Sequence, residues 1–163
     1  MAVNEIHEEK ETLSVDIEIP GHDPRTTTPL FTHTKKLLIE RVGGRCWICG
    51  RTAEESGYPL EGHHHPIERS LANMIDWDLF RLDCVAGVWG PYAAAFDWAN
   101  FDDSDPYTFV DDMTVNGELL CKAHHTGLDE GKHTLPFPLW IAQKYGKENY
   151  QFSKIEIIHH EQD

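Results

Sequence analysis

Asn116-Gly117-Glu118-Leu119-Leu120-Cys121-Lys122-Ala123-His124-His125 is the most informative stretch of this 163-residue chain. The pattern predicts a helix that starts at Asn116, passes through His125 and ends at Gly127 or Gly131. On such a helix Cys121 and His124 are three residues apart and share a face. His125 lies about 100° further round and points to a different side. The two histidines are therefore expected to have different roles.

A second pair of metal-ligand residues lies upstream, in Arg45-Cys46-Trp47-Ile48-Cys49-Gly50-Arg51. A tight knuckle there would turn both thiolates to one side, where they can join Cys121 and His124 around one tetrahedral zinc. A zinc with four protein ligands holds no water, so this ion would stabilise the fold rather than react. His125 could replace His124 as the fourth ligand, since a spacing of four residues also works.

Three consecutive histidines, His63, His64 and His65, fall in a strand predicted over residues 61–67. Successive residues of a strand face opposite sides, so these imidazoles cannot all point the same way. The remaining cysteine, Cys84, has no partner in the sequence and is expected to be a small buried residue.

Gly62-His63-His64, followed at a distance by residues 116–125, resembles the HNH endonucleases, also called ββα-metal nucleases. The separations from Asn116 to Cys121 and to His125 match that family's motif, and many members share the C-x-x-C knuckle. The resemblance covers roughly residues 40–70 and 113–140. It implies an α+β fold: a ββα-metal (HNH) core with a structural zinc, a long acidic and aromatic-rich insertion between the two strands, and flanking helices.

The resemblance also implies roles for individual residues. His64 would be the general base, and Asn116 would orient it through the backbone. His63 and His125 would hold a catalytic divalent metal. An imidazole with its ordinary pKa of about 6.5 suits a base at neutral pH. Because histidine stands at position 63 where aspartate is more common, Mn²⁺ or Ni²⁺ is expected to serve as well as Mg²⁺.

The sequence departs from the family pattern in ways that leave the base open. Because the histidines are tripled, a shift of one residue would make His65 the base. A proline usually follows the base by three residues, whereas Pro66 lies two after His64 and three after His63. Further on, Lys132 and His133 lie in a stretch similar to phage-encoded members of the group, and both could touch a phosphate.

Charge is distributed unevenly along the chain. There are 28 acidic and 14 Lys and Arg residues, a net charge of −14, which is the wrong sign for gripping DNA by bulk electrostatics. Residues 70–112 hold nine aspartates, one arginine and three tryptophans. Because so many aromatic residues need a packing surface, we expect an ordered insertion there. We expect residues 1–32 to form an acidic N-terminal arm and residues 33–163 a single HNH-like domain.

The rest of the chain contains simpler patterns. A helix is expected over residues 33–42, ended by Gly43 and Gly44, and a short strand over residues 111–115. Weaker patterns predict strands over residues 13–19 and 155–158 and a helix over residues 139–145. The sequence contains neither a membrane-spanning apolar run nor a signal peptide, so we expect a cytoplasmic protein with reduced cysteines.

Two functions from different classes follow. The first is a metal-dependent endonuclease that hydrolyses DNA phosphodiester bonds, with a nickase that cuts one strand as a variant of the same function. Eight cations would contact the nucleic-acid backbone: Lys35, Lys36, Arg41, Arg45, Arg51, Arg69, Lys122 and Lys132. The second is a phage-encoded, non-catalytic zinc scaffold of HNH origin that binds a host protein through residues 70–112.

Overall fold

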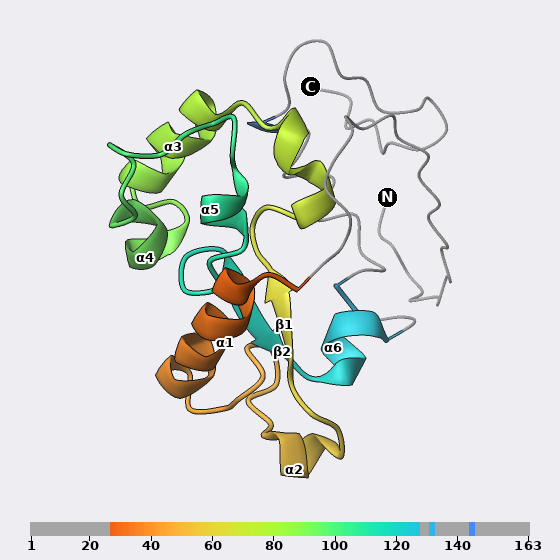
Figure 1. Ribbon diagram of the computed structural model, residues 1–163. Coiled ribbons are helices and arrows are strands. Elements are labelled where there is room, and N and C mark those ends of the chain that lie inside the picture. The colour runs from red at the N-terminus through yellow and green to blue at the C-terminus, as the bar shows by residue number, and fades with distance from the viewer. Residues whose placement is uncertain (1–26, 128–130, 133–143, 146–163) are drawn as a thin grey trace, which may run out of the picture.

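The computed structural model describes residues 27–127, 131–132 and 144–145. The N-terminal arm up to residue 26, the predicted strands over residues 13–19 and 155–158, most of the helix predicted over residues 139–145, and His133 lie outside these ranges. Within them, residues 27–64 and 117–127 make up one half of the molecule, and the insertion makes up the other (Figure 1).

A two-stranded antiparallel hairpin is the centre of the first half. Strand β1 (Glu61–His64) pairs with β2 (Gly117–Leu120), and His63 lies opposite Glu118. Helix α1 (Pro29–Arg41) lies on one side of the hairpin and α6 (Lys122–Thr126) on the other (Figure 1). The strands pair although more than fifty residues separate them in the chain.

The helix predicted from Asn116 onwards is wrong over its first half. Residues Gly117–Leu120 are strand β2, and only Lys122–Thr126 is helical. Leu119 packs on the α1 side, against Leu38 and Met113, while Leu120 packs on the other side, against Cys46 and Cys121. Adjacent leucines can be buried on opposite sides only in a strand, because successive side chains there alternate.

Helix α1 begins four residues before the predicted position. The Thr28 side chain accepts a hydrogen bond from the Phe31 N–H at 3.1 Å, and Pro29 occupies the first turn. Both features are typical of helix N-termini, so the start was readable from the sequence. The helix ends at Arg41, one residue before the predicted end, and the predicted terminators Gly43 and Gly44 follow in left-handed backbone conformations.

The insertion folds into four short helices around a core of aromatic rings. They are the 3₁₀ helix η1 (Arg69–Met74), α3 (Trp77–Val85), α4 (Gly90–Ala94) and α5 (Tyr107–Val110). Phe80 is fully buried, and its ring centroid lies 5.5 Å from those of Trp77 and Phe109 in edge-to-face contacts. Cys84 is buried in the same core, and burial, with the nearby Asp83 charge, raises the pKa of its thiol to about 12. Cys84 is therefore an inert packing residue.

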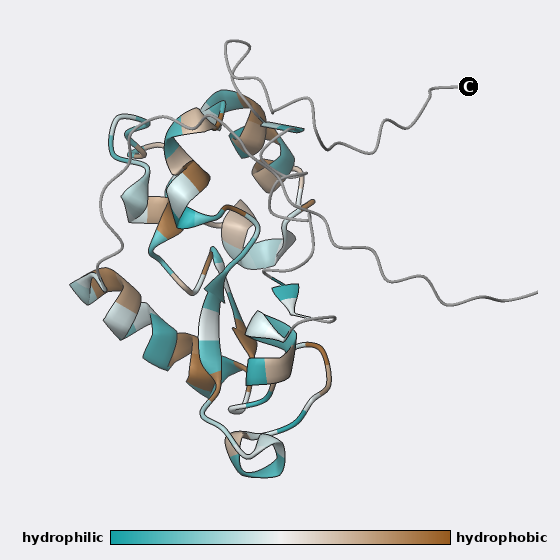
Figure 2. Cartoon of the chain, turned by 90° about the vertical axis from the view of Figure 1, so that its right-hand side faces the viewer, coloured by the Kyte–Doolittle hydropathy of each residue, from teal (hydrophilic) through white to brown (hydrophobic). Residues whose placement is uncertain are grey.

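The strand predicted over residues 111–115 is wrong. Asp111 caps the end of α5, and the residues after it form turns in which Asp112 accepts hydrogen bonds from the Thr114 backbone and hydroxyl. Side-chain bonds of this kind compete with strand pairing. Figure 2 shows hydrophobic and hydrophilic residues interleaved along the helices, as expected for short helices that bury one side. No helix in the described part of the chain is long and apolar enough to cross a membrane.

Candidate functional site

Four predicted ligands meet between the knuckle and α6. The side-chain ligand atoms of Cys46, Cys49, Cys121 and His124 all lie within 4.8 Å of one another. The Cys49 and Cys121 sulfurs are 3.9 Å apart, and the His124 Nδ1 lies 3.2 Å from the Cys121 sulfur and 3.8 Å from that of Cys46. A tetrahedral zinc with bonds of about 2.0–2.3 Å requires ligand separations of roughly 3.3–3.8 Å. The group is therefore compatible with a zinc-binding site.

Backbone hydrogen bonds place the knuckle and prepare its thiols. The Trp47 N–H donates to the Leu119 carbonyl at 2.8 Å, which attaches the knuckle to β2. Burial opposes ionisation of Cys46, but hydrogen bonds from backbone groups of Cys49, Cys121 and Ile48 outweigh it and lower the pKa of this thiol to about 6. Cys46 is therefore ready to bind a cation as a thiolate at neutral pH.

A second cluster lies on the face of β1 that is turned toward α6. His63 is 2% exposed, and its ring centroid is 5.3 Å from that of His125 on α6. The His63 Nε2 lies 3.1 Å from a carboxylate oxygen of Glu68. The His125 Nδ1 lies 2.5 Å from a carboxylate oxygen of Glu61. Two imidazole–carboxylate pairs therefore lie next to each other here, side chains suited to acid–base chemistry or to binding a divalent cation.

Lys132 and His65 extend this cluster toward the insertion. The Lys132 ammonium pairs with the Glu118 carboxylate and donates a hydrogen bond to the His65 Nδ1 at 2.8 Å. Burial, helped by the Lys132 charge, lowers the pKa of His65 to about 4. His65 is therefore neutral at pH 7, and its Nδ1 accepts the hydrogen bond from the lysine. We refer to Glu61, His63, His65, Glu68, Glu118, His125 and Lys132 together as the histidine face.

His64, the base predicted from the sequence, lies on the opposite face of β1. Its Nε2 is 3.3 Å from a carboxylate oxygen of Asp111, and its ring contacts Phe31 of α1 at a centroid distance of 5.4 Å. The structure thus brings together His63 and His125, the two predicted metal ligands, but it separates both from His64. Of the other two histidines, only His65 is on the same side as His63.

Asp111 is a buried hydrogen-bond acceptor that joins three segments. Its carboxylate is 2% exposed and accepts from the Arg69 Nε at 3.1 Å and the Thr28 hydroxyl at 3.1 Å, besides His64. Burial would raise its pKa, but the hydrogen bond from His64 and the Arg69 charge outweigh burial and lower it. Folding therefore favours the ionised form of the Asp111 carboxylate.

Replacing Asp111 is expected to destabilise the protein in a pH-dependent way. Asp111→Ala removes the carboxylate that pairs with the buried Arg69 guanidinium, which should reduce the free energy of unfolding by about 3–5 kcal/mol. The contribution is fully present above the unfolded-state pKa of about 3.9 and is lost as the pH falls through the lower folded-state pKa. Urea unfolding of wild type and Asp111→Asn checks this: their difference should shrink below about pH 4, and a constant difference would contradict the assignment.

Asn116 closes the base of the insertion. Its side chain is fully buried, accepts from the Ile67 N–H at 3.0 Å and donates to the carbonyls of Ile67 and Val110 at 2.9 Å each. Its own carbonyl accepts from the His65 N–H at 3.1 Å. Asn116 therefore holds the chain just after the histidines through both its side chain and its backbone. The backbone bond is to His65, not to His64.

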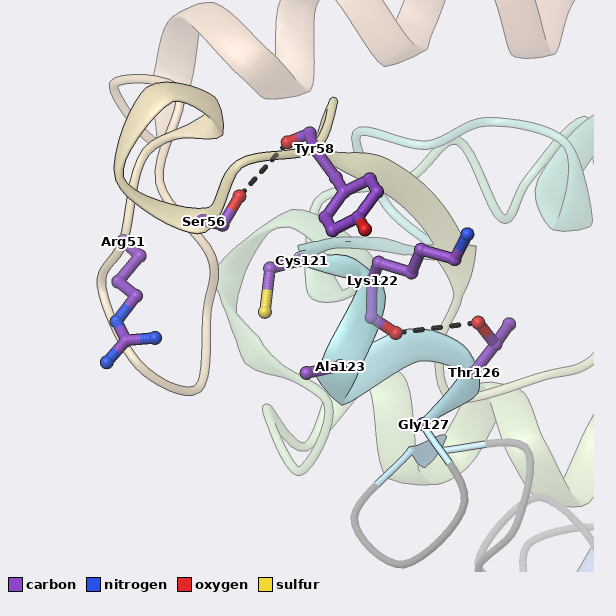
Figure 3. A pocket seen from close by; sticks show the side chains of 8 residues that line it. All are labelled: Arg51, Ser56, Tyr58, Cys121, Lys122, Ala123, Thr126 and Gly127. Atoms are coloured by element: carbon purple, nitrogen blue, oxygen red, sulfur yellow. Dashed lines mark hydrogen bonds between the residues drawn. The ribbon is translucent and has the colours of Figure 1, made fainter.

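A pocket of about 300 Å³ whose lining includes two cations lies beside α6 (Figure 3). The Lys122 ammonium lies 5.0 Å from the centre of the Tyr58 ring, and Ser56 donates to the Tyr58 carbonyl at 3.0 Å. The lining residues are Arg51, Ser56, Tyr58, Cys121, Lys122, Ala123, Thr126 and Gly127. Arg51 and Lys122 give this pocket a positive charge, although most of its lining surface is apolar.

The sequence reasoning missed the carboxylates that surround the histidines. Glu61 stands two residues before His63, so strand alternation would have placed both on one face. Glu118 lies opposite His63 in the hairpin, which could be found only after recognising β2. Glu68 and Asp111 carried no comparable signal, because their positions depend on how the insertion folds.

Comparisons with protein-family profiles, with curated proteins and with solved structures found no match to this chain. The function must therefore be argued from the residues and their arrangement.

Proposed function

We propose that this protein is a metal-dependent nuclease of the HNH type that hydrolyses DNA phosphodiester bonds. The observation that carries the proposal is the hairpin β1–β2 leading directly into α6, with His63 and His125 facing each other between them. This arrangement agrees in order and in spacing with the motif that the sequence resembles. The neighbouring zinc-ligand cluster, formed by Cys46, Cys49, Cys121 and His124, supports a structural zinc.

The roles within the proposed site follow from which side chains share a face. We assign the general base to His63 instead of His64, because His63 faces α6 and Pro66 follows it by three residues. Glu68, 3.1 Å away, would orient the His63 imidazole and stabilise the imidazolium formed when it takes a proton from the attacking water. His64 would instead support the fold through Asp111.

His125 and Glu61 are the residues that would hold a catalytic cation. The His125 Nδ1 and a Glu61 carboxylate oxygen are hydrogen-bonded neighbours 2.5 Å apart, and one imidazole with one carboxylate suits Mg²⁺, Mn²⁺ or Ni²⁺. Among the described residues, only the zinc-ligand cluster brings three or more ligand atoms within 4.8 Å of one another. A cation held by His125 and Glu61 would therefore complete its coordination with waters or substrate oxygens. When bound, such a cation neutralises charge on the scissile phosphate and the leaving oxygen.

The charge distribution restricts how DNA could approach. Of the eight cations expected near the site, Arg69 pairs with buried Asp111, Lys132 pairs with Glu118, and Arg41 lies 3.8 Å from the Tyr92 ring centre. Arg51 and Lys122 line the pocket beside α6 and are exposed. We therefore infer that the nucleic acid approaches over α6 and the knuckle, away from the acidic insertion.

Cleavage of a supercoiled plasmid tests the proposal. Zinc-loaded protein would be incubated at low salt with added Mg²⁺, Mn²⁺ or Ni²⁺, and with no added cation as a control. Nicked or linear product that depends on the cation, and that decreases steeply with salt, is the expected result. Folded, zinc-containing protein that cuts neither DNA nor RNA with any of the three cations would overturn it.

One observation favours a second function, a scaffold that binds another protein through the insertion. Helix α3 and the turn after it expose apolar side chains on this acidic half of the molecule: Leu79, Leu82, Val85 and Val88. Exposed apolar groups rimmed by charge are common in protein-binding surfaces. Such a scaffold would keep its partner affinity in His63→Ala, whereas the nuclease would lose its activity.

A further inference from the structure

Trp47 is an exposed aromatic residue in the middle of the zinc-binding knuckle. Its side chain is 66% exposed, although it stands next to Cys46, which is 2% exposed. Its backbone N–H donates a hydrogen bond to the Leu119 carbonyl of β2, and Cys46 and Cys49 on either side of it would bind the zinc. The indole is thus presented to solvent by a rigid support.

The exposed indole borders the histidine face. Its ring centroid is 6.2 Å from that of His65, and the Lys132 ammonium lies 5.9 Å from its centre. The other side of His65 is flanked by Trp89, 6.1 Å away in an edge-on contact. A strand that reached His63 and His125 would therefore pass an aromatic surface next to the site.

We propose that Trp47 is a stacking platform for an unpaired base, so that the substrate is a single-stranded or locally unpaired nucleic acid. This inference rests on the proposed function and specifies its substrate class. With a net charge of −14, long-range attraction of the chain to phosphates is weak, so the few exposed cations beside α6 need a further source of binding energy. Stacking on an aromatic ring does not depend on net charge and accepts every base. In an intact duplex the faces of the bases are covered by their neighbours and cannot reach the indole.

The experiment separates stacking from phosphate contacts. Two fluorescent 12-residue strands are compared, oligo(dT) and an abasic strand of equal length and charge. Binding is measured by anisotropy with zinc-loaded His63→Ala protein and no added divalent cation, so that nothing is cut. Wild-type Trp47 should favour oligo(dT) by about tenfold or more, and both strands should bind more tightly than a 12-base-pair duplex.

Substitutions in the knuckle assign the preference to the indole. Trp47→Ala should abolish the preference for oligo(dT), and Trp47→Phe should retain part of it. Ile48→Ala is the matched control, since Ile48 is 53% exposed in the same knuckle but has no ring; it should behave as wild type. Zinc content, measured for each variant, shows that the knuckle is intact.

The outcomes also separate this inference from the proposed nuclease activity. Equal binding of the two strands, or a preference that survives in zinc-loaded Trp47→Ala, overturns the stacking platform even if plasmid cleavage is observed. A preference that depends on Trp47 supports the platform even if no cation gives cleavage, and the protein would then bind unpaired strands without cutting them. Tighter binding of the duplex than of either strand also overturns it.

Discussion

His63→Ala is expected to reduce cation-dependent cleavage by about a hundredfold to ten-thousandfold, the usual contribution of a general base. The expectation depends on geometry: His63 faces His125 across the gap between β1 and α6, and Glu68 lies beside its Nε2. Single-turnover cleavage of a labelled oligonucleotide at saturating cation measures the effect on the chemical step. Imidazole added to the His63→Ala reaction should restore part of the rate.

His64→Ala is the matched control for this prediction. His64 is the neighbouring residue of the same strand, but it faces α1 and Asp111. Its replacement should lower thermal stability while leaving most of the cleavage rate. If His64→Ala were inactive and His63→Ala active, the base would be His64, as the resemblance alone suggests. If only His65→Ala were inactive, the base would be His65.

Removal of zinc is expected to unfold the first half of the molecule. Zinc sites with thiolate and imidazole ligands bind with roughly 10–16 kcal/mol of apparent free energy, as much as the whole stability of a typical domain. Helix α6 has only five residues and α2 (Ala53–Ser56) has four, so neither is stable on its own. A strong zinc chelator, or Cys49→Ala, should therefore abolish cooperative thermal unfolding and helical circular dichroism from this half.

The zinc prediction has a matched cysteine control. Cys84→Ala removes a thiol from the insertion core, far from the metal ligands in the fold, and should retain one zinc per chain. Elemental analysis of both variants gives the stoichiometry. A Cys49→Ala protein that keeps one zinc and unfolds like wild type would show that the zinc-ligand cluster is not a structural zinc site. Added zinc should restore the chelated protein but not Cys49→Ala.

The short-range chemistry of the site was predictable from the sequence. The spacings within Cys46–Cys49 and Cys121–His124 identify two pairs of ligands, because each pair lies in one local turn, and the fold brings the two pairs together. The meeting of His63 and His125 was also anticipated. Strand β2 is not predicted by the sequence, because the helical pattern of residues 122–126 continues toward the N-terminus through residues that form the strand.

The distribution of the histidines between faces required the structure. Alternation along a strand shows that His63 and His64 differ in direction, but it does not say which one faces α6. That choice depends on α1, whose Phe31 occupies the other side together with Asp111. Asp111 lies 47 positions after His64, and no local pattern links the two residues.

The bridge that Asn116 makes across the base of the insertion affects how such a protein can change over evolutionary time. Because the Asn116 side chain bridges Ile67 and Val110, the chain leaves the hairpin and returns to it at nearly one point. Lengthening a segment that is joined in this way is cheap, about 0.6 kcal/mol of closure entropy for each doubling. The chain after Arg69 and before Val110 can therefore be lengthened or shortened while the two strands, the zinc ligands, Glu68 and His125 keep their places.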